Sequence, residues 1–180
     1  MGGVVASLLA VCLPGTAAAE VAAKGSTGFT VVHELRLEAT PERAYQALTA
    51  EVASWWDPSH SYSHDAGNFT MDARAGGCFC ERLPNGGSVE HMRVVFAAPG
   101  KRLRLMGGLG PLQGIGASGP MDFELAPNGD ATRLTFRYTV SGFAPDGLDA
   151  MAEPVDGVLR GQLTRLAAYL RTGDPARSDA

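Results

Sequence analysis

The sequence predicts one α+β domain of the helix-grip type, in which a seven-stranded, curved antiparallel sheet surrounds a long C-terminal helix. Three observations predict it. The chain has 180 residues, enough for one domain with a sizeable core but not for two ordinary domains. Most of it consists of short apolar runs separated by turn residues, and only the last long run has a helical period. A curled sheet buries its apolar face against such a helix and leaves space for a cavity between them.

Composition and charge restrict the class of protein. Apolar residues make up 45% of the chain and charged residues 19%, as in globular domains. The formal net charge of −4 argues against binding to a phosphate backbone, so no nucleic-acid partner is expected. The apolar run at residues 4–13 is too short to cross a bilayer, so the protein is not expected to span a membrane.

Residues 1–19 have the features of a signal peptide that is cleaved before Glu20. Pro14 and Gly15 end the apolar run, and alanines follow just before the predicted cleavage position. The predicted location is the periplasm, with residues 20–28 as a linker to a domain that covers 29–172. The stretch before the apolar run lacks Lys and Arg, which leaves a cytoplasmic location as the alternative.

The first strand and two short helices are predicted in that order. Alternation of apolar with other residues indicates a half-buried strand at 29–37. Thr40 then provides an N-cap, and Pro41 a first helical position, for a short helix. A second helix is expected over 51–56, where it ends because Pro58 disfavours helical geometry at the residue before it.

Six further strands are predicted to form a meander. Clusters of Gly, Pro and Asn separate them, as in short turns. In the last two strands the apolar residues share one face and the charged residues the other, so one face of the sheet is expected to contact water. The six predicted strands are 69–73, 78–83, 89–97, 102–106, 120–126 and 132–141.

Apolar residues near the C-terminus recur at intervals of three and four, which predicts an amphipathic helix over 154–172. Pro154 fits its first turn, with a separate turn at 149–153 before it. Gly173 ends the helix, and 173–180 is expected to be a mobile tail. The buried face is expected to include Leu159, Leu163 and Leu166.

The chain resembles the SRPBCC superfamily over about residues 29–172. The likeness is carried by Ala-Thr-Pro-Glu-Arg-Ala-Tyr at 39–45, Trp-Trp-Asp-Pro-Ser-His at 55–60 and Gly-Cys-Phe-Cys-Glu-Arg at 77–82, and it continues in 109–113 and 158–166. Members include START lipid-binding domains, birch-pollen allergens, polyketide cyclases and heat-shock-ATPase-activator-like proteins. The resemblance implies the helix-grip fold, a cavity that commonly holds lipids, sterols, hormones or aromatic intermediates, and a bacterial branch similar to the activators or the cyclases.

We therefore expect a small apolar or aromatic molecule to bind between the sheet and the C-terminal helix. The two tryptophans are expected near the mouth of the cavity, with core packing as the alternative for at least one of them. The amide of Gln162 needs a hydrogen-bond partner, which a backbone group or the ligand supplies. The predicted ligand-binding residues are Trp55, Trp56, Tyr62, Met121, Phe123, Phe136, Tyr138, Leu159, Gln162 and Leu163.

Glu81 and His91 are candidate catalytic residues on neighbouring strands. If residues 85–87 form a three-residue loop, Glu81 lies directly opposite His91 and the side chains can bond. A slip of one residue would place Cys80 there instead. An ordinary surface pair is the alternative, because the more apolar set would occupy the interior. That set is Cys78, Cys80, Met92, Val94 and Phe96.

No metal site and no cofactor are expected. His60, a further catalytic candidate, and His64 would share a face only on a helix, which Pro58 and the nearby serines disfavour. Cys78 and Cys80 lie two residue rises apart on a predicted strand, roughly 6.6 Å, so that a disulfide would be strained. We expect small core residues there, with a redox or metal pair as the alternative.

The leading functional hypothesis is a noncatalytic carrier or sensor of a small apolar molecule. A cyclase-like or hydratase-like enzyme that uses Glu81, His91 or His60 is the first alternative, and a protein-binding module similar to the chaperone activators is the second. The glycine-rich segment 107–116 lacks the Lys-Ser/Thr ending of a phosphate loop, so it is expected to form an apolar lid and not a nucleotide site.

Overall fold

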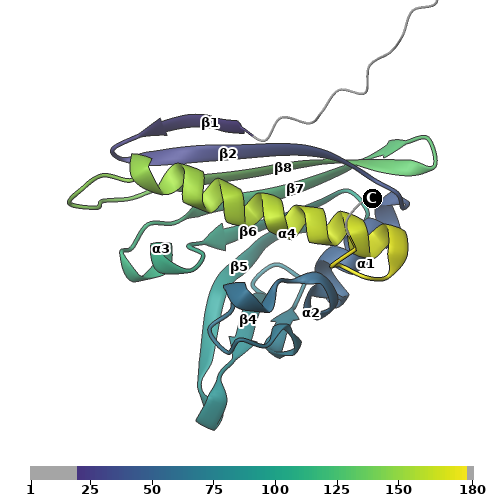
Figure 1. Ribbon diagram of the computed structural model, residues 1–180, viewed down its shortest axis with the longest axis horizontal. Coiled ribbons are helices and arrows are strands. Elements are labelled where there is room, and N and C mark those ends of the chain that lie inside the picture. The colour runs from purple at the N-terminus through teal and green to yellow at the C-terminus, as the bar shows by residue number, and fades with distance from the viewer. Residues whose placement is uncertain (1–19, 178–180) are drawn as a thin grey trace, which may run out of the picture.

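The computed structural model describes residues 20–177 and contains one antiparallel sheet in the order β1-β2-β8-β7-β6-β5-β4-β3 (Figure 1). The strands are β1 Glu20–Gly25, β2 Gly28–Leu37, β3 Phe69–Met71, β4 Cys78–Arg82, β5 Ser88–Ala98, β6 Arg102–Gly107, β7 Gly119–Asn128 and β8 Ala131–Ser141. The α-helices are α1 Pro41–Ala50, α2 Val52–Trp55, α3 Pro111–Gly114 and α4 Ala152–Thr172. Short 3-10 turns are η1 Pro58–His60, η2 Ala66–Asn68, η3 Pro84–Gly86 and η4 Asp149–Met151.

The sheet has eight strands, so the prediction of seven is wrong by one. The additional strand is β1, whose residues were assigned to a linker and which pairs antiparallel with β2 at the edge of the sheet. Its sequence, Glu-Val-Ala-Ala-Lys-Gly, does not alternate clearly between apolar and polar residues. Its strand conformation therefore depends on pairing with the open edge of β2 and not on its own sequence pattern. The predicted signal peptide at 1–19 lies outside the described residues.

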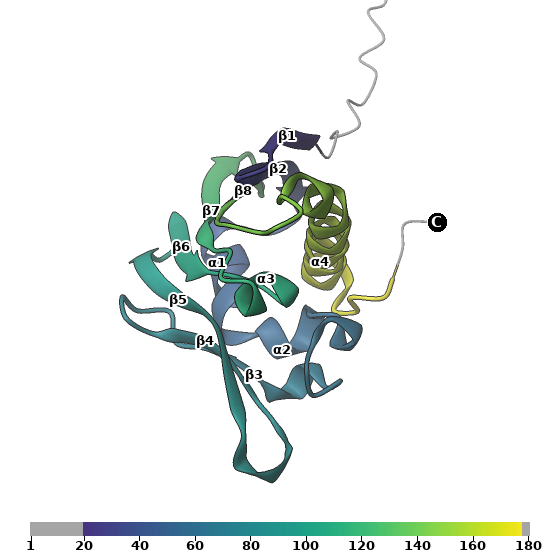
Figure 2. The same cartoon turned by 90° about the vertical axis from the view of Figure 1, so that its left-hand side faces the viewer.

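The sheet curves around α4, as Figure 2 shows by looking along the helix. Leu159, Leu163 and Leu166 are all buried, which confirms the predicted helix face. Pro154 lies in the first turn of α4, the η4 turn precedes it, and Gly173 ends the helix with a φ of 77°. No helix within residues 20–177 is long and apolar enough to cross a membrane.

Helices α1 and α2 pack under the C-terminal half of α4 (Figure 1). The predicted N-cap of α1 is confirmed, because the Thr40 hydroxyl accepts a hydrogen bond from the Arg43 amide. The Trp55 indole, on α2, donates to the Ala47 carbonyl at 2.8 Å and is buried. This end of the domain is therefore solid core, and the open space lies toward the start of α4.

Candidate ligand-binding site

A cavity of about 560 Å³ lies between the first half of α4, the η1 segment, β5 and the α3 segment. This volume is typical of sites for small organic molecules. Its walls are mainly apolar, with two histidines, a tyrosine and two serines among them. The lining residues are Trp56, Ser59, His60, Ser61, Tyr62, His91, Leu109, Gly110, Pro111, Leu112, Met151, Pro154, Val155, Val158 and Leu159.

Five of the predicted site residues line this cavity, and the others lie elsewhere. The cavity receives Trp56, Tyr62 and Leu159 from the predicted ligand-binding set, and His60 and His91 from the catalytic candidates. The predicted residues of β7 and β8 are packed in the core. The members outside the cavity wall are Trp55, Glu81, Met121, Phe123, Phe136, Tyr138, Gln162 and Leu163.

The inward side chains of β7 and β8 fill the space in which the ligand was predicted to bind. Phe123 and Phe136 pack edge to face, with ring centroids 5.0 Å apart. The Tyr138 hydroxyl donates to the Gly107 carbonyl at 3.1 Å and accepts from the Leu109 amide at 3.3 Å, so it is occupied by the backbone. Met121 and Phe123 border a separate void of about 20 Å³, which is room for about one water molecule.

Gln162 has a structural partner on its oxygen. Its Oε1 accepts a hydrogen bond from the Asp57 amide at 2.9 Å, which ties α4 to the segment just before η1. Its Nε2 is buried and has no hydrogen-bond partner in the described part of the chain. Gln162 therefore positions one cavity wall from behind, without lining the cavity itself.

A β-bulge on β5 brings His91 to the inner face of the sheet. Phe79 pairs with Met92 and Cys80 pairs with Glu90, so His91 has no residue opposite it. His91 and Met92 are consecutive, yet both are buried, with 5% and 1% exposure. The bulge thus places a titratable side chain on the face that lines the cavity.

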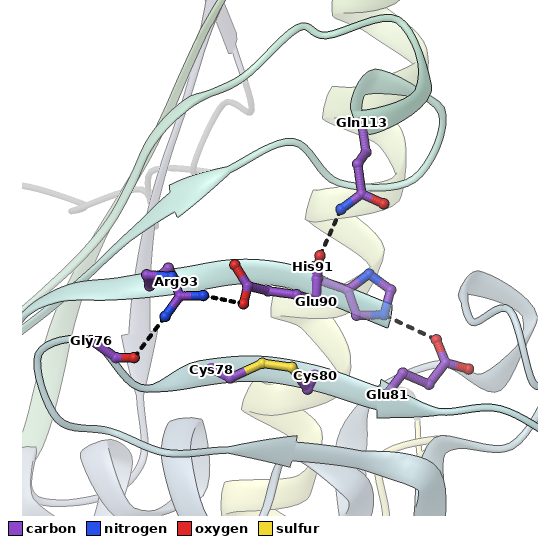
Figure 3. The surroundings of a disulfide bond; sticks show 8 residues. All are labelled: Gly76, Cys78, Cys80, Glu81, Glu90, His91, Arg93 and Gln113. Atoms are coloured by element: carbon purple, nitrogen blue, oxygen red, sulfur yellow. Dashed lines mark hydrogen bonds and ion pairs between the residues drawn. A yellow bond between two sulfur atoms is a disulfide. The ribbon is translucent and has the colours of Figure 1, made fainter. Parts of the chain in front are cut away.

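The predicted contact between Glu81 and His91 is confirmed, but the predicted register is wrong. The loop consists of 84–86 and not 85–87, so Glu81 lies opposite Val89. The bulge compensates for this shift and leaves His91 Nε2 at 2.9 Å from Glu81 Oε2 (Figure 3). The alternative, in which Cys78, Cys80 and Phe96 face inward, is wrong. Phe79 and Glu81 are the buried residues of β4, and the bulges at His91 and Val95 change the alternation along β5, so that Phe96 is exposed.

Glu81 holds the segment that forms one wall of the cavity. Its carboxylate is 1% exposed and accepts hydrogen bonds from the backbone amides of Tyr62, at 3.1 Å, and Ser63, at 2.5 Å. With His91 it therefore has three partners, which is what a buried carboxylate needs. One side chain on β4 thus fixes both the wall at Tyr62 and the orientation of His91.

The same environment sets the protonation of the pair. Burial disfavours the charged form of Glu81, but hydrogen bonds from Ser63, Tyr62 and His91 outweigh it, and the pKa of Glu81 is lowered. Burial lowers the pKa of His91, and Glu81 opposes this shift only in part. At neutral pH the pair consists of a carboxylate and a neutral imidazole. Because Nε2 faces the carboxylate, Nε2 carries the proton and Nδ1 is the free acceptor.

Aromatic rings surround this pair. Tyr62 stacks on His91 with ring centroids 5.8 Å apart, and Phe69 and Phe79 contact the imidazole from the other strands. Trp56 packs on both phenylalanines at 5.4 Å and donates from its indole to the His60 carbonyl at 3.0 Å. The rings pack around the imidazole, while His91, Trp56 and Tyr62 all remain in the cavity wall.

The rest of the wall comes from the α3 segment and from the residues around the start of α4, which were not among the predicted site residues. Segment 107–116, expected to be a lid, contains α3, which begins at Pro111 and buries Leu112. Tyr62 Oη donates to the Gly110 carbonyl at 3.3 Å and so connects the η1 side of the cavity to α3. The η4 turn adds Met151, and the start of α4 adds Val155 and Val158. The spacing of these residues in the sequence indicates a helix, but it does not indicate that they line a cavity.

Cys78 and Cys80 form a disulfide, so the prediction of two core thiols is wrong. Their Cα atoms are 5.4 Å apart, closer than in a flat strand and within the range of disulfides. With Glu90 they form the one group of possible metal ligands in residues 20–177, but here the sulfurs are bonded to each other.

A second buried polar pair lies away from the cavity. His33 Nε2 on β2 is 3.0 Å from Asp156 Oδ1 on α4, but the atoms are not aligned as a hydrogen bond and have no other partner in the described range. Burial lowers the pKa of His33, and Asp156 opposes the shift. Neither residue lines the cavity, so the pair connects helix to sheet and is not part of the candidate site.

Comparisons with known proteins agree with this fold. Residues 38–171 match the family model described as Activator of Hsp90 ATPase homolog 1-like protein. None of the curated proteins matches the chain.

Solved structures with the same fold have low sequence identity. The Aha1 dimer from Colwellia psychrerythraea is 23% identical, with a TM-score of 0.53 over 80% of this chain and 97% of that one. CalU16 from Micromonospora echinospora is 15% identical, with a TM-score of 0.52 over 81% and 78%. The Mll3558 protein from Rhizobium loti is 25% identical, with a TM-score of 0.53 over 76% and 95%.

Proposed function

The chain belongs to the Activator of Hsp90 ATPase homolog 1-like family, and we propose that it uses this fold to bind one small, largely apolar molecule in the cavity between α4 and β5. The observation that carries the proposal is a cavity of about 560 Å³ whose mainly apolar wall includes the buried His91, with Glu81 hydrogen-bonded behind it. A ligand with one hydroxyl or similar donor group fits this chemistry, since His91 Nδ1 can accept its proton.

Trp56 should report ligand entry, and Trp55 should not. Trp56 lines the cavity, whereas Trp55 is buried behind it and hydrogen-bonded to Ala47. We expect apolar phenols and fatty alcohols to change tryptophan emission in a saturable way. The change should survive Trp55→Phe and disappear in Trp56→Phe, while binding measured by calorimetry persists in both. A signal that follows Trp55 would place the ligand outside this cavity.

Filling the cavity should abolish binding without unfolding the domain. Val158 lines the cavity from α4, and Val158→Trp would occupy part of the volume that the ligand needs. We expect affinity to fall at least about tenfold, the effect of roughly 1.4 kcal/mol. Thr164→Trp is the matched control, because Thr164 is exposed on the same helix. Equal binding by the two variants would contradict the proposed location.

Binding of a donor ligand should weaken as the pH falls through the pKa of His91. That pKa lies below its ordinary value of 6.5, so the acceptor form of His91 persists into mildly acidic solution. Protonation removes the Nδ1 acceptor, and affinity for a phenol or alcohol should then decrease. His91→Gln should remove this pH dependence in titrations between about pH 7 and pH 5. A pH dependence that remains in the variant would assign it to another group.

Acid-base catalysis on the bound molecule is a second candidate function, favoured by the carboxylate behind His91. Glu81 holds the Nε2–H tautomer and would stabilise the imidazolium that forms when Nδ1 takes a proton. Native mass spectrometry can identify a molecule that copurifies with the protein. Incubation of that molecule with the native protein and with His91→Gln then separates the functions, because only an enzyme changes its mass or isomer composition. If no small molecule binds, a protein-binding role becomes the better hypothesis.

A further inference from the structure

Cys78 and Cys80 are joined by a disulfide along β4 (Figure 3), and the alternation of burial in this strand places them on the face opposite to Phe79 and Glu81. Both cysteines are only partly buried, whereas their neighbours Phe79 and Glu81 point inward and are buried. The sulfur atoms are therefore accessible from solvent through a face that the cavity does not use.

The bond contributes little as a structural staple. It connects residues separated by two positions within one strand, so it closes a very short loop and removes little conformational entropy from the unfolded chain. Hydrogen bonds to β3 and β5 already hold this strand in place on both sides. A contribution to stability therefore does not explain the disulfide, and its redox chemistry is the better explanation.

A carboxylate oxygen of Glu90 lies within 4.8 Å of both sulfurs, so the difference between the two cysteines rests on Arg93. In the register of β4 and β5, Arg93 lies directly opposite Cys78, and Glu90 lies opposite Cys80. Arg93 is held there by a hydrogen bond to the Gly76 carbonyl at 3.0 Å and by an ion pair with Glu90. A nearby guanidinium favours a thiolate and a nearby carboxylate disfavours it. Cys78 is therefore the better thiolate, and the better leaving group when the disulfide is attacked.

We propose that Cys78 and Cys80 form a reversible thiol–disulfide exchange site for an external thiol. A thiolate of the reductant attacks Cys80 Sγ; the bond between the two protein sulfurs breaks, and its electron pair leaves on Cys78 Sγ beside Arg93. A second thiolate of the reductant then attacks its own sulfur in the mixed disulfide and releases Cys80, and each cysteine takes up one proton. Two electrons and two protons pass to the protein, and two external thiols become one disulfide.

The test is a redox titration of the folded protein, read by alkylation and intact mass. In one arm the reductant is glutathione, and in the other it is a dithiol protein of the thioredoxin class. We expect full, reversible interconversion between the dithiol and the disulfide, and the faster arm identifies the class of reductant. Resistance to both reductants in the folded state, or failure of oxidised glutathione to restore the bond, would overturn the proposal.

Single variants test the assigned roles. Alkylation of the remaining thiol near neutral pH should be about threefold to tenfold faster in Cys80→Ser, which retains Cys78, than in Cys78→Ser. Adding Arg93→Gln to Cys80→Ser should remove most of this advantage, whereas Arg74→Gln, an exposed arginine paired with Asp72, should not. The opposite order of rates would refute the assignment of Cys78 as leaving group. A large loss of thermal stability in the double serine variant would assign the bond a structural role instead.

Discussion

Glu81→Ala is expected to destabilise the domain by about 3–5 kcal/mol and to abolish ligand binding. The change leaves the amides of Tyr62 and Ser63 without an acceptor and removes the only polar partner of His91 Nε2 in the described structure. Chemical denaturation measures the loss. Glu124→Gln is the control, because that exposed carboxylate pairs only with Arg102 on the surface and should cost less than about 1 kcal/mol.

The pH dependence of stability gives a further check on Glu81. Its pKa is lower in the folded state than its ordinary value of 4.5, so its stabilising contribution is complete above about pH 4.5. The contribution is lost as the pH falls through the folded pKa. Glu81→Gln should therefore have a smaller loss of stability between pH 5 and pH 3 than the native protein. Equal acid sensitivity would show that other carboxylates dominate this range.

Leu166→Ala is expected to cost about 2–5 kcal/mol, and Leu159→Ala clearly less. The two leucines lie on the same helix and face the same sheet, but Leu166 is enclosed by core and Leu159 lines the cavity. Truncation of Leu166 creates a new void, whereas truncation of Leu159 enlarges an existing one. Paired denaturation curves measure the difference between the two variants.

The same two variants should have the opposite order in ligand binding. Leu159→Ala changes the shape of the site and should alter affinity, while Leu166→Ala should leave affinity unchanged as long as the protein is folded. If both variants lost the same stability, Leu159 would be as tightly packed as Leu166 in solution. The cavity would then be closed in the protein without ligand.

The sequence was sufficient for the architecture because the patterns were long. The alternation in β2 extends over a ten-residue strand, and the leucines of α4 recur at helical spacing over several turns. Patterns of this length specify the type of element reliably. It was not sufficient for β1, whose conformation depends on the free edge of β2. Apart from α3 and the short 3-10 turns, the predicted order of helices and strands after residue 28 agrees with the structure.

The site was predictable only in part, because tertiary contacts decide which inward residues border a void. Phe123 and Phe136 face inward as the alternation predicts, but they pack against each other and leave no space. The loop before β5 begins one residue earlier than expected, and a bulge then restores the contact of Glu81 with His91. Turn residues indicate that a loop exists, whereas its length and the position of a bulge depend on both strands.

The hydrogen bonds from Tyr62 and Ser63 to Glu81 also have a consequence for rates. Both amides belong to an irregular segment, whose amides would ordinarily exchange rapidly with solvent hydrogen. Here their exchange requires that the segment detach from Glu81. Detachment also moves Tyr62, whose side chain connects this segment to Gly110. Slow exchange at Tyr62 and Ser63 would therefore measure how often the cavity opens, and that frequency sets the upper limit for the dissociation rate of any ligand that leaves by this side.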